Sequence, residues 1–271
     1  MNFKTPVELA EGACLAAETK SRRTVAQLLV LGTLAGAYIA FGGFFMLIVT
    51  QDLAGFAGVG VSRLMGGGAF SLGLMLVVVA GGELFTGNCM MPLGTLAGCA
   101  PLGKVLRNWF WVYVANALGS LVVLFLLHRA GLLRGAVAAN ALKIAVAKTS
   151  LTVGEAFCRG ILCNWLVVLA VWMSMAATDI AGKLLAILFP ITAFVASGFE
   201  HCVANFFLIP AGLLAAGEGA EALLSPARLS LGGLFRNLVP VTAGNIVGGV
   251  LFVAVAYFFV FRDRLRRPDG P

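Results

Sequence analysis

The stretch SGFEHCVANFFLIP, residues 197–210, places a carboxyl group and an imidazole inside a long apolar run. Glu200 and His201 are adjacent there, with AFVA before the stretch and AG after it. A second polar interruption, GGELFTGN at residues 81–88, divides an earlier apolar run. An ionisable side chain inside a membrane span costs on the order of 3 kcal/mol and usually marks a functional path. These two interruptions decide how the rest of the chain is interpreted.

The composition indicates a membrane protein. Of the 271 residues, 60% are hydrophobic and 11% are charged, and the mean hydropathy is +0.98. A soluble domain has about 25% charged residues. The net charge is +7, but the basic residues flank apolar runs and form no stripe with exposed aromatics, which disfavours nucleic-acid binding. The N-terminus is too charged for a cleavable signal, and its apolar spacing predicts a short amphipathic helix over residues 5–20.

Six membrane spans are predicted from the apolar runs. A helix that crosses a bilayer needs about 20 apolar residues. Two long runs, residues 64–103 and 184–217, are each broken near the middle, and each counts as one broken span. The uninterrupted spans are residues 25–50, 109–127, 160–178 and 237–261.

The two breaks occupy matching places, because each lies in the second span of a group of three. Three plus three spans must face opposite ways, which is the pattern of an inverted repeat with discontinuous helices. Irregular backbone at that depth must be buried in protein or line a cavity. We therefore expect an all-α membrane protein of two inverted three-helix repeats, with breaks at residues 81–88 and 197–205. Gly244, Gly248 and Gly249 predict close helix packing.

Basic clusters at both ends predict the topology. SRR at residues 21–23 and RDRLRR at residues 262–267 lie just outside the first and last spans, and such clusters favour the cytoplasm. We expect a cytoplasmic N-terminal segment at residues 1–24, a channel domain at residues 25–262 and a cytoplasmic tail at residues 263–271. The N-terminal helix either caps the cytoplasmic mouth or rests on the bilayer surface.

Polar residues in the spans favour an anion path. A neutral imidazole at His201 can donate a hydrogen bond to an anion, and a protonated one can give up a proton. Helix N-termini at the breaks carry partial positive charge, which also favours anions. Thr86 adds a hydroxyl in the opposite break. Asn164 and Asn245 lie in other spans and could bond along the same path or between helices.

The remaining polar residues have structural interpretations. Glu83 and Glu200 can accept hydrogen bonds from backbone N–H groups freed at the breaks, so we interpret them mainly as shaping the loops. Lys148, taken alone, is an interfacial lysine. With two histidines, one of them His128 at a span end, we expect no metal and no cofactor. The six cysteines contain no CxxC pair and are interpreted as packing residues: Cys14, Cys89, Cys99, Cys158, Cys163 and Cys202.

Four motifs together resemble the formate/nitrite transporter family. They are LFTGN (84–88), CNWLVVLAVWMS (163–174), SGFEHCVANFFLIP (197–210) and PVTAGNIVGG (240–249), and the opening TPVELAEG (5–12) is also similar. The resemblance runs from about residue 5 to residue 262. It implies an aquaporin-like six-span fold with a pore in each protomer, a pentamer, and a prokaryotic inner membrane. The substrates it implies are small weak-acid anions: formate, nitrite, hydrosulfide, acetate or lactate.

The resemblance also assigns roles to residues. It makes Lys148, seven residues before Glu155, an electrostatic attractor for the anion. Arg159 departs from an apolar position in some relatives and lies at a subunit contact or in a vestibule. Pathway residues are His201, Glu200, Thr86, Asn164 and Asn245; apolar constrictions are Phe70, Leu74, Leu84 and Phe194; the loop residues are Glu83, Gly87 and Asn88.

These features predict that a weak-acid anion, most simply formate, is neutralised before it crosses the apolar constriction. The proton comes from His201 or from water relayed by it. Within the family the alternatives are a nitrite or hydrosulfide channel, and a channel for the bare anion. Outside it, an aquaporin-like channel for neutral solutes would need NPA-like breaks, and a membrane enzyme or metal carrier would need clustered ligands. We expect no enzymatic activity.

Overall fold

The computed structural model describes residues 3–217 and 229–265, and apart from one isolated bridge between Phe3 and Ala177 these residues are helical or in connecting turns. Residues 266–271 of the predicted tail lie outside the described part. The helices are α1 (Pro6–Ser21), α2 (Val25–Thr50), α3 (Leu53–Ala57), α4 (Val59–Leu76), η1 (Val77–Gly81), α5 (Phe85–Asn88), α6 (Pro92–Leu96), α7 (Leu102–Arg129), α8 (Gly135–Thr149), α9 (Val153–Ala176), α10 (Ile180–Ala196), α11 (Cys202–Gly217), α12 (Leu231–Gly249), η3 (Val250–Val255) and α13 (Ala256–Leu265).

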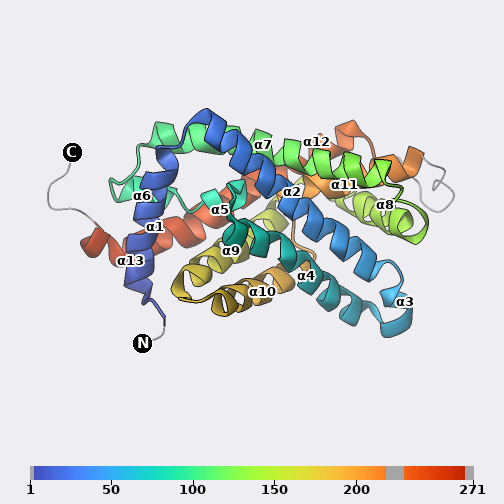
Figure 1. Cartoon of the computed structure of the whole chain (residues 1–271), viewed down its shortest axis with the longest axis horizontal. Coiled ribbons are helices and arrows are strands. Elements are labelled where there is room, and N and C mark those ends of the chain that lie inside the picture. Colours follow the sequence, from blue (N-terminus) through green and yellow to red (C-terminus); the bar gives the residue numbers. More distant parts are fainter. Residues whose placement is uncertain (1–2, 218–228, 266–271) are drawn as a thin grey trace.

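The predicted all-α membrane fold is confirmed. Within the described residues, five helical segments are long and apolar enough to cross a membrane: α2, α4 with η1, α7, α9, and α12 through α13. The apolar helices α10 and α11 are shorter and follow one another across the second break. Figure 1 shows α1, α6 and α13 at one end of the long axis, and α3 and α8 at the other.

Each break begins where a glycine leaves the helix. Gly81 ends η1 with φ of 93°, and Gly198 follows α10 with φ of 73°. Both values lie in the left-handed region, which costs glycine little and other residues more. The first break then runs extended into the short helix α5. The second is shorter than the predicted residues 197–205, because helix α11 already starts at Cys202.

Helix α8 was not predicted. Its polar residues and its 15-residue length placed it outside the apolar spans. A stripe at helical spacing is nevertheless buried: Ala138, Ala141, Leu142, Ala145 and Thr149. This stripe packs on α11, where a Cβ at Gly212 would lie 2.2 Å from the Ala145 Cβ atom. The segment is too short to cross the bilayer, and its buried stripe packs on α11 instead.

The predicted close packing at the glycines of α12 is confirmed. A Cβ added to Gly244 would lie 2.2 Å from the Phe157 carbonyl oxygen of α9, and one added to Gly248 would lie 2.3 Å from the Ile161 carbonyl oxygen. Gly249 faces the first break instead, 2.6 Å from the Cys89 Cβ atom. These contacts leave no space for a side chain, so the backbones of α9 and α12 touch.

The interpretation of all six cysteines as packing residues is wrong for two of them. Cys14 in α1 and Cys99 after α6 form a disulfide, with 5.8 Å between their Cα atoms. They are 85 residues apart in the sequence, and no spacing rule links them. The packing of α1 against α6 brings them together. The other four cysteines are free, and three of those are buried.

Candidate functional site: two charged vestibules and a closed constriction

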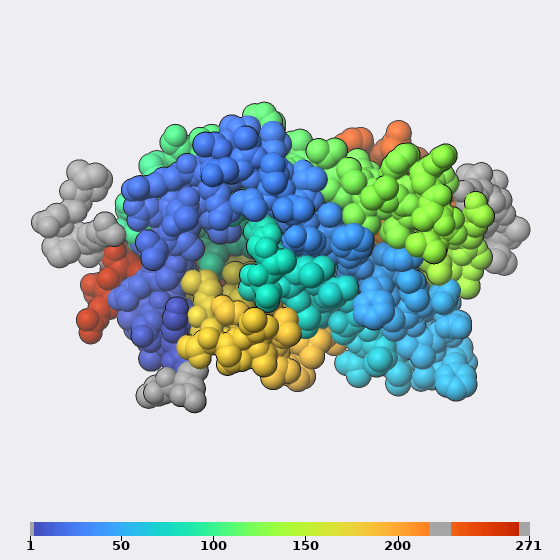
Figure 2. All heavy atoms as spheres, in the orientation of Figure 1, coloured from blue at the N-terminus to red at the C-terminus, as the bar shows by residue number. Residues whose placement is uncertain are grey.

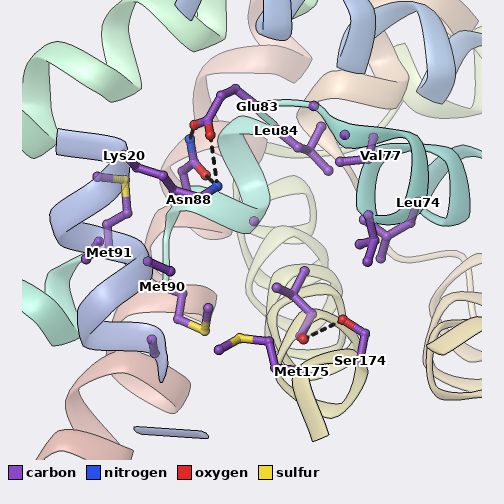
Figure 3. Close-up of a pocket in the computed structure, with 18 of the residues that line it drawn as sticks. Lys20, Leu74, Val77, Glu83, Leu84, Asn88, Met90, Met91, Ser174 and Met175 are labelled. Carbon is purple, nitrogen blue, oxygen red and sulfur yellow. Dashed lines mark hydrogen bonds and ion pairs between the residues drawn. The ribbon is translucent and has the colours of Figure 1, made fainter. Parts of the chain in front are cut away.

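One cavity lies beside the first break and is called the Glu83 vestibule. Its volume is about 320 Å³, and its charged lining residues are Lys20, Arg23, Glu83 and Lys183. Helix α1 contributes to this lining, and Figure 3 shows Lys20 reaching toward Glu83 and Asn88. In Figure 2 the segment around the first break (teal) lies between α2 (blue) and the α9–α10 connection (yellow).

A second cavity lies beside the second break and is called the Glu200 vestibule. Its volume is about 280 Å³, and its charged lining residues are Arg63, Lys148, Arg159 and Glu200. His201 also lines it, so the imidazole faces a cavity, as an anion path requires. The second break therefore opens toward a space lined by three cations and one carboxylate.

Apolar side chains separate the two vestibules. Leu74 and Leu84 line the Glu83 vestibule, whereas Phe70 and Phe194 line the Glu200 vestibule. Phe70 and Leu74 are four residues apart on α4, so the cavities approach to about 6 Å along that helix. The Phe70 and Phe194 rings pack edge to face with centroids 5.7 Å apart, and Phe194 stacks on His201 at 5.9 Å. Phe70 and Phe194, two of the four side chains predicted as constrictions, are thus in contact, and all four are 3% exposed or less.

His201 and Thr86 meet between the two breaks. The His201 Nε2 atom lies 3.0 Å from the Thr86 hydroxyl oxygen, and both side chains are buried. The Ala204 backbone N–H donates to His201 Nδ1 at 3.0 Å. Because Nδ1 accepts, the proton of the neutral ring is on Nε2, which donates to Thr86. The Thr86 hydroxyl proton is left to donate elsewhere.

Glu83 is held by a polar network at the first break. Lys20 Nζ lies 3.1 Å from Glu83 Oε1, and Arg23 forms an ion pair with the same oxygen. Asn88 Nδ2 donates to Glu83 Oε2 at 2.5 Å, and Asn108 Nδ2 donates to it at 3.3 Å. Glu83 is fully buried, so these bonds replace the water that an ionised carboxylate loses on burial.

Glu200 has the matching network at the second break. Lys148 Nζ donates to Glu200 Oε1 at 2.9 Å. Asn205 Nδ2 and Asn237 Nδ2 donate to Glu200 Oε2 at 2.7 and 3.3 Å. Lys148 therefore contacts a pathway carboxylate, which the sequence pattern did not indicate. Both carboxylates brace their breaks, and both also line a vestibule.

The predicted pathway asparagines bind backbone. Asn245 accepts from the Cys202 N–H at 2.9 Å and donates to the carbonyl oxygens of Gly160 and Glu200 at 2.8 and 2.9 Å. Asn164 donates to the Asn245 carbonyl oxygen at 2.7 Å and to the Thr86 carbonyl oxygen at 3.2 Å. Neither side chain lines either vestibule. Of the two roles left open for them, helix-to-helix bonding is the one observed.

Sequence reasoning missed two residues of the first break that correspond to residues of the second. Asn116 does for the first break what Asn245 does for the second, because it accepts from the Phe85 N–H at 2.9 Å and donates to the Glu83 carbonyl oxygen at 2.8 Å. A signal was present in the chain: KSRRTVAQ at residues 20–27 recurs as KTSLTVGE at residues 148–155. In each, a lysine precedes a helix-capping threonine by four residues. Lys20 is therefore the repeat counterpart of Lys148.

A membrane-spanning bundle with a charged cavity on each side of a narrow apolar constriction defines a channel or transporter for small solutes. Among the described residues, no group of three or more His, Cys, Asp or Glu side chains could hold a metal ion.

Comparisons with known proteins agree with this class. The sequence model of the formate/nitrite transporter family matches residues 7–259. A probable formate transporter of Methanothermobacter thermautotrophicus is 42% identical, over 96% of this chain and 98% of its own length. The formate channel FocA of Escherichia coli is 35% identical, over 94% of both chains. The solved structure of a pentameric formate channel with formate bound superposes with a TM-score of 0.77 at 34% identity, covering 88% of this chain and 98% of that one.

The chain belongs to the formate/nitrite transporter family. It is a multi-pass membrane protein of a family of channels and transporters, not of enzymes.

Proposed function

We propose that the protein conducts formate across the membrane and that the anion passes between the two vestibules at His201 and Thr86. The single observation that carries the proposal is the bond between these two side chains, at the apolar closure between two cationic cavities. The names of similar proteins support formate in particular. The same resemblance supports a homopentamer and an inner membrane of a prokaryote, and the basic clusters support cytoplasmic termini.

Electrostatics explains why a weak-acid anion suits this path. Moving a bare ion into a medium of low dielectric costs on the order of 20 kcal/mol in the idealised limit. The side chains of Phe70, Leu74, Leu84 and Phe194 present such a medium. Formate escapes the cost because dehydration raises its affinity for a proton, and the neutral acid crosses the apolar closure. Chloride is too weak a base to take this route.

His201 acts as a hydrogen-bond donor in this proposal. Its Nδ1 atom accepts from the Ala204 N–H, so the Nε2 proton can leave only if Nδ1 gains one. The proton that neutralises the anion therefore arrives through water beside the ring, and the imidazole and the Thr86 hydroxyl orient the acid. A bare-anion channel is the rival, and it requires the ring to stay neutral while net charge crosses.

Formate uptake by proteoliposomes tests the proposal. We expect His201→Phe to abolish uptake driven by an inward proton gradient, because the donor at the closure is lost. Thr86→Val should reduce uptake about tenfold or more, because a hydrogen bond to a charged group is worth about 1.5 kcal/mol or more. The control is His128→Phe, the same substitution at the other histidine. His128 lines neither vestibule, so this variant should transport formate normally.

Normal formate uptake by both His201→Phe and Thr86→Val would contradict the proposal. Steady current carried by formate across a planar bilayer, unaffected by the proton gradient, would favour the bare-anion rival. Competition by nitrite or hydrosulfide in the same assay ranks the three anions. Swelling in glycerol would identify a channel for neutral solutes.

A further inference from the structure

The Glu200 vestibule holds more positive charge than its carboxylate balances. Three cations line it, Arg63, Lys148 and Arg159, against one carboxylate, Glu200. Lys148 is paired with that carboxylate at 2.9 Å, and only 13% of the lysine side chain is exposed. Within residues 3–217 and 229–265, neither arginine makes an ion pair. Because Lys148 is neutralised by Glu200, the remaining positive charge of the lining resides on the two arginines. Exposed Glu155, one turn before Arg159 on α9, offsets part of the charge of Arg159.

Arg159 is the arginine that lies beside the break. Its backbone carbonyl oxygen accepts from the Glu200 N–H at 3.2 Å. Its guanidinium has one long hydrogen bond, from Nη1 to the Gly198 carbonyl oxygen at 3.4 Å. A guanidinium has five N–H donors, so most of them are left for a ligand in the cavity. Arg63 is exposed at the start of α4.

Comparison of the two repeats shows that the fold does not need a guanidinium here. At the first break the Glu83 N–H donates to the Leu31 carbonyl oxygen at 3.1 Å, the same backbone contact that Arg159 makes with Glu200. A leucine therefore supports one break as the arginine supports the other. The contact uses the backbone carbonyl group, which every residue has. The break therefore does not depend on the arginine side chain at this position.

We propose that Arg159 captures the anion in the Glu200 vestibule before it reaches Phe194 and His201. Its planar fork of N–H donors matches the two oxygens of a small carboxylate, and within the described residues no carboxylate lies within ion-pair distance of it. This inference rests on the proposed function, because it names the residue that recognises the anion of that path. Lys148 then serves chiefly to pair with Glu200 and to hold the break in shape.

The test measures KM and maximal rate of formate uptake in vesicles with the Glu200 vestibule facing outward. We expect Arg159→Leu, which copies Leu31, to raise KM about tenfold at low ionic strength, because a charged cleft concentrates anions by that order. The maximal rate should stay near that of the unaltered protein. Half a molar sodium gluconate should shrink the KM difference to less than about threefold, since salt screens such attraction. Arg159→Lys keeps the charge but loses the planar fork, so its KM should lie between those of the unaltered protein and Arg159→Leu.

Arg129→Leu is the matched control. It removes the same charge from an exposed residue at the end of α7, close in sequence to α8 and outside the cavity. A KM for Arg159→Leu equal to that of Arg129→Leu at low salt would overturn the inference. Arg159→Gln, which removes the charge but keeps a polar side chain, gives the same answer if the leucine variant fails to insert. Absence of uptake by the unaltered protein would instead contradict the proposed function, so the two failures are distinguishable.

Discussion

Single buried amides hold the breaks in shape. At each break one asparagine accepts a backbone N–H and donates to two backbone carbonyl oxygens: Asn116 at the first, Asn245 at the second. In hydrocarbon no water can replace these partners, so the irregular backbone depends on side-chain bonds. The amide group suits this task because it combines an acceptor with two donors.

Replacing Asn245 by aspartate tests that role. Asn245→Asp keeps the size and the acceptor but sets a carboxylate oxygen against the carbonyl oxygens of Gly160 and Glu200. Two buried acceptors lose their donor, and we expect a loss of at least about 3 kcal/mol in stability. The thermal midpoint of the detergent-solubilised protein measures it.

The control for this change is Gln27→Glu. Gln27 is exposed at the start of α2, and its Oε1 atom accepts from the Thr24 N–H at 2.9 Å. Glutamate preserves that contact because it uses only the acceptor, so the midpoint should hardly change. An Asn245→Asp midpoint within 2 °C of the control would show that the amide donors do not support the break.

At the scale of helices, small residues set how closely the repeats pack. Helices α9 and α12 touch at Gly244 and Gly248. Helices α2 and α7 touch at Gly36 and Gly119, where added Cβ atoms would lie 2.0 and 1.9 Å from carbonyl oxygens of the facing helix. Membrane helices gain little from burying apolar surface, so such backbone contact is a main source of their association. Close contact also places Asn164 and Asn245 within reach of the break.

Gly244→Ala tests this dependence. The added methyl group would overlap the Phe157 carbonyl oxygen, so α9 and α12 must separate, at a cost of about 1–3 kcal/mol. We expect a lower thermal midpoint and slower formate uptake, since the asparagine contacts lengthen. Gly154→Ala in α9, where nothing lies within 4 Å of an added Cβ, should leave both unchanged. Equal midpoints for the two variants would contradict the packing argument.

At the scale of the whole molecule, large apolar side chains cover the outer face. Residues 60% exposed or more include Phe110 and Phe125 on α7, Phe189 on α10, and Phe235 and Val239 on α12. A soluble monomer rarely presents so much apolar surface. In a membrane, part of this apolar surface can contact lipid and part can contact neighbouring subunits.

The proposed pentamer is tested by native mass spectrometry of the protein released from detergent. We expect an assembly of five copies of the 28.2 kDa chain, because subunits that share an apolar face close into a ring. Phe125→Ser lies on this face and would weaken the assembly if its ring packs between subunits, whereas lipid contact would leave the mass unchanged. A mass of one chain for the unaltered protein in mild detergent would contradict the pentamer.

The sequence by itself determined the class of protein and the two breaks, because these follow from local composition and from the length of a bilayer-crossing helix. It also carried the motifs around Thr86 and His201. The tertiary structure alone decided which groups meet: the Thr86–His201 bond, the pairing of Lys148 with Glu200, the bond of Asn116 to the first break, and the Cys14–Cys99 disulfide. The partners in these contacts lie 31 to 115 residues apart in the sequence. Their distances depend on how helices pack, and a pattern that acts over one or two turns cannot specify them.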